Sequence, residues 1–258
     1  MNMSFYVGAL GANNCTRKLN VISNNLANVN NAGFKPKTAS FSELVNYNMG
    51  PEGNATAGSG MKVRSTSTSF ETSAFTPTGG EYDYAIADSN AFFMVQDPVS
   101  GANAFTRNGQ FHRGEWEDEF YLMTQSGKLV LDQNQEPLKA DVIDTEKLLA
   151  EMEEGYEEEY DDYDSEEDEN KPKLSLYTFN NPSRLVSIGD NEYVPVGEDA
   201  EAILVERPAL VGGSLEASGT DIAKELTRLI ECQRAFSYAA RMVTTSDEIE
   251  GVINSLRG

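Results

Sequence analysis

The chain has 258 residues, 42 of them acidic and 20 basic, and its formal net charge is -22 at pH 7. That charge argues against electrostatic binding to nucleic acid or to anionic lipid, and no apolar run approaches the roughly 20 residues that a membrane-spanning helix needs. The length is compatible with one or two domains.

A helix is predicted at the N-terminus, within residues 1–34. Alternate steps of three and four residues along this segment meet only apolar or small side chains, as in the seam of a coiled coil. The seam positions are Phe5, Gly8, Ala12, Cys15, Leu19, Ile22, Leu26 and Val29. The small residues Gly8 and Ala12 would let a partner helix approach closely. The alternative is that the seam is the core-facing stripe of an ordinary amphipathic helix.

The end of this segment, VISNNLANVNNAGFK at 21–35, contains five asparagines, although asparagine is a mediocre helix former. An amide side chain both donates and accepts hydrogen bonds, so it can satisfy backbone groups that a helix end leaves open. Gly33 can adopt a positive φ, and Phe34 can anchor the chain as it leaves the helix. We therefore expect these residues to act through hydrogen bonds and turn geometry.

The middle of the chain has the composition of β structure. Residues 35–80 are rich in Ser, Thr, Gly and Asn, which predicts an extended linker or a hairpin. In residues 81–213, short strand-like runs alternate with Gly, Asn, Pro and Asp, which predicts a β-rich domain. An acidic insertion at about 141–171 interrupts this domain, and its residues 151–170 include 13 acidic and no basic side chains. We expect the run to be solvated, since it lacks the glycine and the alternating ligands of a calcium loop.

A second long helix is predicted within residues 214–258. Ser218 with Asp221 three residues later suggests a capping box, and no proline follows before Leu256, so a helix of nearly forty residues could form. Its seam positions are Ile222, Leu226, Leu229, Gln233, Phe236, Ala240 and Val243, and the apolar line resumes out of phase at Ile249, Ile253 and Leu256. Two seams at the extreme ends of the chain, with strand-like runs between them, predict an α+β fold with long terminal helices, and helices of this length are better placed beside other long helices than inside a small globule.

Catalytic chemistry has little support in the sequence. His112 is the only histidine, so a multi-histidine metal site has at most one participant and any Ser-His-Asp or Cys-His arrangement would have to use this one residue. His112 lies in FHRGEW and is interpreted as structural, and we expect no catalytic, metal-binding or cofactor-binding residues. Cys15 and Cys232 are too few for a disulfide framework and are interpreted as two semi-buried thiols. We expect no cleaved Sec signal, because Met1 is followed by neither a basic nor an apolar region.

The motifs at both ends resemble one protein family. SNNLANVNNAGFK at 23–35 resembles the N-terminal signature of the bacterial flagellar rod and hook proteins, S-x-N-[LI]-A-N-x-x-T-x-G-F-K, with Asn31 in place of the usual Thr. The segment 213–258 is similar to the family's C-terminal helix with its E-x-Q-R-A-[YF] core, here at 231–236, and AFFMVQ and FTRNGQF resemble its β domain. Two features depart from the pattern: Ser89-Asn90-Ala91 replace a usual G-x-G, and the acidic run has no counterpart.

The resemblance implies a structural subunit of the flagellar basal-body rod. Its terminal helices would pair as a coiled-coil-like axial domain and polymerise helically with copies of itself and other rod or hook proteins, transmitting torque from motor to hook. Location in the basal body outside the cytoplasmic membrane, after export by the flagellar type III apparatus, is also implied. The alternatives are a hook-type axial protein and a secreted coiled-coil adhesive or binding module. The residues expected at the subunit interface are Leu19, Ile22, Asn24, Asn25, Leu26, Asn28, Val29, Gly33, Phe34, Ile222, Leu226, Leu229, Gln233, Arg234, Phe236 and Val243.

Overall fold

The structure, a computed structural model, describes residues 3–44, 47–48, 56–140, 174–197, 200–205 and 208–257. The predicted acidic insertion lies outside these residues. The chain forms two compact units, which are described separately: a helical unit of residues 1–29, 36–69 and 220–258, and a β unit of residues 30–35 and 70–219. The chain therefore passes from one unit to the other four times.

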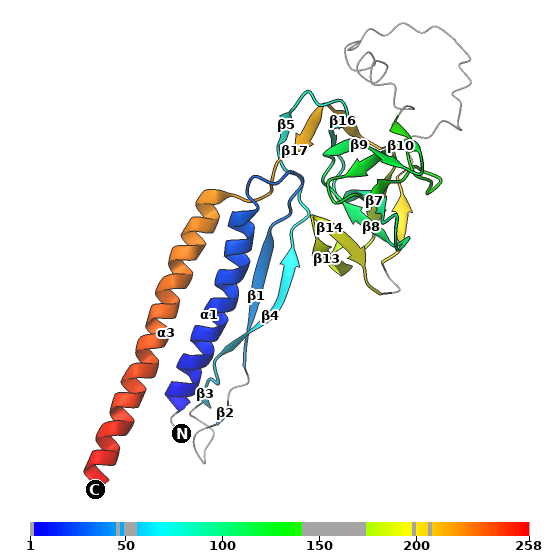
Figure 1. The fold of residues 1–258 in the computed structure, drawn as a ribbon. Helices are drawn as coiled ribbons and strands as arrows, with labels where there is room; N and C mark the ends of the chain where they lie inside the picture. Colours follow the sequence, from blue (N-terminus) through cyan, green and yellow to red (C-terminus); the bar gives the residue numbers. More distant parts are fainter. Residues whose placement is uncertain are drawn as a thin grey trace, which may run out of the picture. The chain divides into compact units, whose positions relative to one another are not determined.

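The helical unit consists of two helices and a ribbon of strands (Figure 1). Helix α1 (Met3–Ala27) packs on one side against helix α3 (Ile222–Arg257) and on the other against an antiparallel pair, β1 (Lys37–Glu43) and β4 (Met61–Thr68). The short strands β2 (Tyr47–Asn48) and β3 (Thr56–Ala57) also pair. Both predicted terminal helices are thus present, and strands form within the segment that was expected to be linker or hairpin.

Helices α1 and α3 run antiparallel. The hydroxyl oxygens of Ser4 and Ser246 lie 2.9 Å apart, whereas Cys15 contacts Cys232, so rising numbers along α1 meet falling numbers along α3. Helix α3 begins after Asp221, whose carboxylate accepts a hydrogen bond from the Lys224 backbone N–H at 3.1 Å. The predicted capping box starting at Ser218 was therefore wrong by three residues: Asp221 is itself the N-cap, the position where a carboxylate best satisfies the first open N–H groups.

The β unit is built on one large sheet with the strand order β13-β14-β8-β7-β11-β10-β9, and β12 pairs with both β7 and β15. Its strands are β7 (Ala91–Gln96), β8 (Asn103–Thr106), β9 (Phe111–Trp116), β10 (Glu119–Thr124), β11 (Leu129–Val130), β12 (Leu176–Phe179), β13 (Leu185–Gly189), β14 (Glu192–Pro195) and β15 (Ala202–Leu204), with the short 3-10 helix η2 (Pro182–Arg184) before β13. Two smaller antiparallel pairs are β5 (Phe75–Pro77) with β17 (Ser214–Glu216), and β6 (Tyr84–Ile86) with β16 (Leu210–Gly212).

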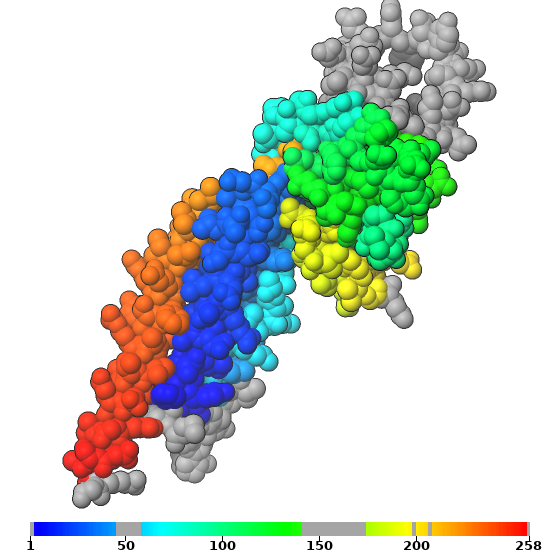
Figure 2. All heavy atoms as spheres, in the orientation of Figure 1, coloured from blue at the N-terminus to red at the C-terminus, as the bar shows by residue number. Residues whose placement is uncertain are grey.

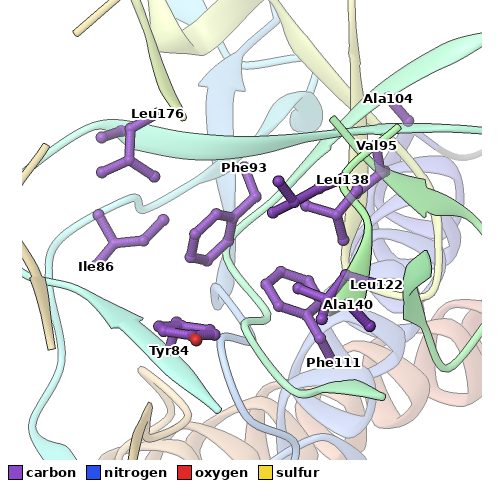
Figure 3. Close-up of a cluster of buried hydrophobic side chains, with 12 residues drawn as sticks. Tyr84, Ile86, Phe93, Val95, Ala104, Phe111, Leu122, Leu138, Ala140 and Leu176 are labelled. Atoms are coloured by element: carbon purple, nitrogen blue, oxygen red, sulfur yellow. The ribbon is translucent and has the colours of Figure 1, made fainter. Parts of the chain in front are cut away.

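Strand β7 is buried on both faces and lies between the two hydrophobic clusters of this unit. Because side chains alternate along a strand, Phe93 and Val95 enter one cluster, drawn in Figure 3, and Phe92 and Met94 enter the other. Before the strand, at the place where the family's G-x-G was missing, Asn90 has a φ of +61°. Asparagine tolerates this left-handed conformation better than most residues, so the turn is made without glycine.

No helix in the described part of the chain is long and apolar enough to cross a membrane.

Candidate functional site

The asparagines of α1 hold the β1–β4 ribbon. The Asn25 side-chain N–H donates to the backbone oxygen of Lys37 at 2.7 Å, and its side-chain oxygen accepts from the Lys37 N–H at 2.9 Å. Asn14 makes the same kind of pair with the ribbon, donating to the Met61 oxygen at 2.6 Å and accepting from the Val63 N–H at 3.3 Å. The two asparagines are eleven residues, or about three turns, apart, so they lie on one face of the helix.

The opposite contact of α1 is with α3 and is made by small and apolar side chains. Cys15, Ile22 and Cys232 are buried together, with Leu19 and Leu229 packed against them. A Cβ built on Gly8 would lie 3.0 Å from Cγ2 of Val243 and 3.2 Å from the backbone oxygen of Ala239. The helices therefore approach so closely that glycine is favoured at this position.

Helix α3 also has an apolar ridge that is exposed among the described residues of its own unit. Every fourth residue from 222 to 242 is exposed, and five of the six are apolar or aromatic. These ridge residues are Ile222, Leu226, Ile230, Arg234, Tyr238 and Met242. Rows of residues four apart are the ridges that fit the grooves of a neighbouring helix. Contiguous exposed apolar surface of this kind is typical of interaction sites in proteins.

The C-terminal end of α3 continues beyond its contact with α1. Ser246, the partner of Ser4, is the last buried residue of α3, and every residue from Asp247 to Leu256 is exposed. Figures 1 and 2 show these turns, in red, extending past the start of α1. The exposed residues of this overhang include Ile249, Ile253 and Leu256, the apolar line that the sequence placed out of phase, and also Val252. The change of phase thus coincides with the end of the α1 contact.

The predicted interface residues fall into three groups. In the helical unit, Ile22 and Asn25 are buried and Leu19, Leu26, Asn28, Val29, Leu229 and Val243 are partly buried. Exposed positions are Asn24, Ile222, Leu226, Gln233, Arg234 and Phe236. Gly33 and Phe34 are buried in the β unit. The amide of Asn25 is used within its own chain, and the Asn28 side chain donates to the backbone oxygen of Asn24 at 2.8 Å.

In the β unit, the segment 30–35 lies beside the segment that follows β17. The backbone N–H of Gly33 donates to the Glu216 oxygen at 2.8 Å, and the N–H of Gly219 donates to the Phe34 oxygen at 2.9 Å. Gly33 has a φ of +67°, and a Cβ there would lie 2.7 Å from the carbonyl carbon and oxygen of Arg107. The segment that follows α1 and the segment that leads to α3 therefore lie side by side within the β unit.

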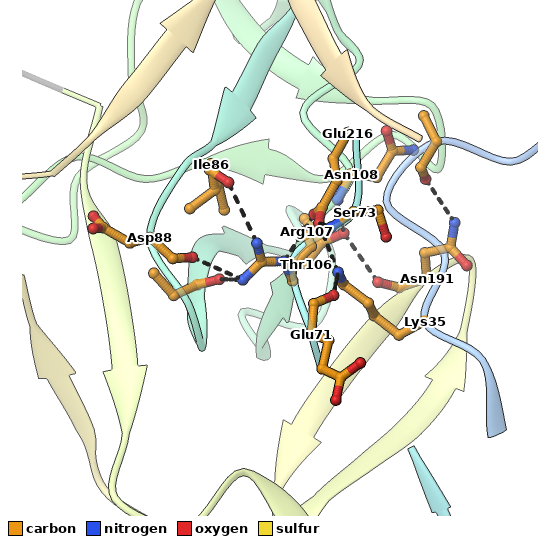
Figure 4. A network of polar contacts seen from close by, with 12 residues as sticks. Lys35, Glu71, Ser73, Ile86, Asp88, Thr106, Arg107, Asn108, Asn191 and Glu216 are labelled. Atoms are coloured by element: carbon orange, nitrogen blue, oxygen red, sulfur yellow. Dashed lines mark hydrogen bonds and ion pairs between the residues drawn. The ribbon is translucent and has the colours of Figure 1, made fainter. Parts of the chain in front are cut away.

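A buried charge cluster joins these segments (Figure 4). Lys35 Nζ donates to Glu216 Oε1 at 2.7 Å, and Arg107 Nε donates to Glu216 Oε2 at 2.9 Å, with all three side chains fully buried. Lys35 also donates to the Glu71 backbone oxygen at 2.6 Å, and the N–H of Ser73 donates to Glu216 Oε1 at 2.7 Å. Burial lowers the pKa of Lys35, and the hydrogen bond to Glu216 opposes that shift.

The sequence did not single out this cluster. Its members are 72 and 109 residues apart, and each lies in a segment that resembles the family: Lys35 ends AGFK, Arg107 is in FTRNGQF, and Glu216 is near the start of the segment 213–258. Each of these three charged residues stands among apolar residues or glycines, and that setting could have indicated that its side chain is buried. Nothing in the spacing indicated that the three meet.

Two family models match the two ends of the chain, and curated relatives align with nearly its full length. Residues 5–35 match the family model "Flagella basal body rod protein", and residues 211–256 match "Flagellar basal body rod FlgEFG protein C-terminal". The chain is 31% identical over 266 residues to the flagellar basal-body rod protein FlgG of Bacillus subtilis, covering 96% of this chain and 97% of that protein. It is 28% identical over 253 residues to FlgF of Caulobacter vibrioides, covering 96% and 95%.

The hook-basal body complex protein FlhP of Bacillus subtilis is 26% identical over 281 residues and aligns over the whole of both chains. The matched N-terminal model ends at Lys35, and the matched C-terminal model begins before Glu216 and covers all but the last residues of α3. The chain belongs to the family of flagellar basal-body rod proteins, and it is a structural subunit of the rod in the basal body of the bacterial flagellum.

Proposed function

We propose that the subunit polymerises helically through its helical unit and that the polymer transmits torque from motor to hook. The exposed ridge of α3, Ile222 to Met242, is the observation that carries this proposal, because a row of apolar side chains four apart can pack into the groove of another subunit's helix. A repeated contact between two different surfaces builds a filament when it does not close into a ring, and the proposed polymer is of this open, helical kind.

Within one subunit, α1 and α3 would pair as a coiled-coil-like axial domain. The antiparallel contact through Gly8, Cys15, Ile22 and Cys232 supports this part of the proposal, since the three α1 residues are seven apart and Leu19 packs against the cluster between Cys15 and Ile22. The ridge lies on a different side of α3, so one helix can contact α1 and a second subunit at the same time.

The proposed interface contains residues that the sequence predicted and further apolar residues that are exposed in the structure. Asn24, Gln233, Arg234 and Phe236 remain available at the surface of the helical unit. Met3, Phe5 and Tyr6 at the start of α1 are exposed apolar side chains that could meet the ridge or the overhang of another subunit. The partners would be copies of this chain and other rod or hook proteins.

We also propose export by the flagellar type III apparatus and a purely structural role without catalysis. A secretion assay in cells with and without that apparatus tests the first part. Continued secretion in its absence would contradict it.

The assembly proposal is tested by placing one charge on the ridge. Ile230→Glu should abolish sedimentable polymers of the purified chain, because polymerisation would have to bury a carboxylate. Thr227→Glu is the control: Thr227 is exposed on the same helix but lies off the ridge. Circular dichroism should show equal helix content in both variants. Polymers of Ile230→Glu forming at the same protein concentration as those of Thr227→Glu would overturn the proposal.

A further inference from the structure

Both cysteines of the chain meet at one place in the helical unit. They are 217 residues apart in sequence, yet the Cys232 thiol donates to the backbone oxygen of Cys15 at 3.2 Å. Both are free thiols and both are buried, and with Ile22 they form the core between α1 and α3. Folding therefore brings the two thiols of the chain to the same helix–helix contact.

The two helices lie close together at the level of the cysteines. A disulfide needs Cα atoms roughly 4.4–6.8 Å apart, which two helices reach only where small side chains separate them. The sulfur of Cys232 lies against the main chain of residue 15, and Gly8 permits a comparably close approach to Ala239 and Val243 two turns away. The sulfur of Cys232 therefore already lies against the residue that carries the other thiol.

We propose that Cys15 and Cys232 are a disulfide site that covalently joins α1 to α3 when the subunit meets a low-molecular-weight disulfide such as oxidised glutathione. One cysteine thiolate attacks that disulfide and releases one thiol, which leaves a mixed disulfide. The second cysteine thiolate then displaces the other thiol and forms the S–S bond. Two cysteine thiols are oxidised, one external disulfide is reduced to two thiols, and the two protons pass to the released thiolates.

Burial of the thiols should limit the rate at which the disulfide forms. Burial raises the pKa of the Cys232 thiol, and the neighbouring Cys15 thiol raises it further. Since the thiolate is the attacking species, the reaction should be slow at neutral pH and faster in mildly alkaline buffer. Once formed, the bond would close a loop of more than 200 residues, and closing a loop restricts the unfolded chain.

The test uses the purified full-length chain, incubated at about pH 8.5 with oxidised glutathione. Tryptic digestion should yield the peptide 1–17 linked to the peptide 229–234. The helix signal should stay constant, while the melting midpoint of the helices should rise by roughly 5–15 °C and return to its starting value after reduction. The double variant Cys15→Ala/Thr16→Cys is the matched control, because it keeps two thiols but moves one to an exposed position on another side of α1.

Three results would overturn the inference: recovery of both cysteines as thiols after oxidation, equal crosslinking of the Cys15→Ala/Thr16→Cys chain, or loss of helix content when the link forms. The inference goes beyond the assembly proposal and can fail without it. The Cys15→Ala/Cys232→Ala chain has no thiol and should polymerise as the unmodified chain does, so polymerisation and crosslinking are measured independently.

Discussion

Glu216 is the residue on which the buried charge cluster of the β unit depends, because two cationic side chains share this one carboxylate away from water. Glu216→Gln keeps the shape of the side chain and removes its charge. It should lower the free energy of unfolding by about 3–5 kcal/mol, since it leaves Lys35 and Arg107 buried without a counter-charge. Trp116, the only tryptophan of the chain, lies in this unit, and its fluorescence during urea unfolding gives the measurement.

The control for this prediction is Glu119→Gln. Glu119 pairs with Lys139 at 2.7 Å, but both side chains are about half exposed. An exposed ion pair contributes about 0–1 kcal/mol. If the two glutamine variants lost equal stability, the buried cluster would have no special importance.

Gly33 allows a second prediction with a matched control. Gly33 and Gly79 both have a φ of +67°, but a Cβ on Gly33 would meet the Arg107 backbone at 2.7 Å, whereas a Cβ on Gly79 would meet nothing within 4 Å. Gly79→Ala should cost about 1 kcal/mol for its φ alone. Gly33→Ala should cost at least about 2 kcal/mol more, because the backbone contact at Arg107 must also move. Similar losses in tryptophan-monitored unfolding would contradict the close approach.

Titration of Tyr84 should make the β unit less stable at alkaline pH. Burial raises the pKa of Tyr84 from 10.0 to about 12, so between these values the unfolded chain loses a proton that the folded chain keeps. The contribution of protonated Tyr84 to the free energy of unfolding is fully present below pH 10. It is lost as the pH rises toward 12, and the loss amounts to about 2–3 kcal/mol. Tyr84→Phe should remove this part of the alkaline loss.

Unfolding midpoints measured from pH 9 to pH 11.5 test the Tyr84 prediction. Tyr238→Phe, at an exposed position on α3, should retain the alkaline loss of the unmodified chain. At pH 7 the Tyr84→Phe variant should be as stable as the unmodified chain, since the Tyr84 hydroxyl is buried without a hydrogen-bond partner among the described residues. An unchanged pH profile in Tyr84→Phe would show that another group causes the loss.

At the scale of elements, the contact between α1 and the β1–β4 ribbon rests on asparagine side chains. Asn25→Ala should remove two hydrogen bonds to Lys37 and expose β1, because the two backbone groups then need water as a partner. Hydrogen exchange in residues 37–43 should become at least tenfold faster. Asn24→Ala is the adjacent control, since Asn24 is exposed. Equal exchange in both variants would mean that the amide does not hold the strand.

The elements were largely predictable from the sequence, while their contacts were predictable only in part. Helical periodicity gave both terminal helices because apolar spacing depends on local geometry. The contacts of individual residues depend on which elements cover each face of their helix. Helix α1 is covered on two faces, and the Asn25 side chain bonds to the β1–β4 ribbon. Helix α3 is covered on one face, and its Ile222 and Leu226 remain exposed. The charge cluster was missed because pairing of residues 35, 107 and 216 is a property of the folded chain alone.

At the scale of the whole molecule, the division into two units means that folding and assembly can be separated by experiment. Along the sequence, residues 36–69 of the helical unit follow one segment of the β unit, 30–35, and precede the other, 70–219. Trp116 reports on the β unit, and helix circular dichroism reports mainly on α1 and α3. A variant that alters one signal and spares the other identifies the unit in which the substituted residue acts.

The overhang of α3 gives the clearest case in which assembly should fail while both units stay folded. Removal of residues 248–258 leaves Ser246 and its contact with Ser4 in place, so the melting midpoints of both units should change little. Polymerisation should require at least a tenfold higher protein concentration, because burial of Ile249, Val252, Ile253 and Leu256 contributes up to about 1.5–3 kcal/mol for each side chain. Replacing these four residues with serine at full length should have the same effect, whereas Asn254→Ser should have none. If the shortened chain polymerised like the unmodified one, the overhang would lie outside the contacts that build the rod.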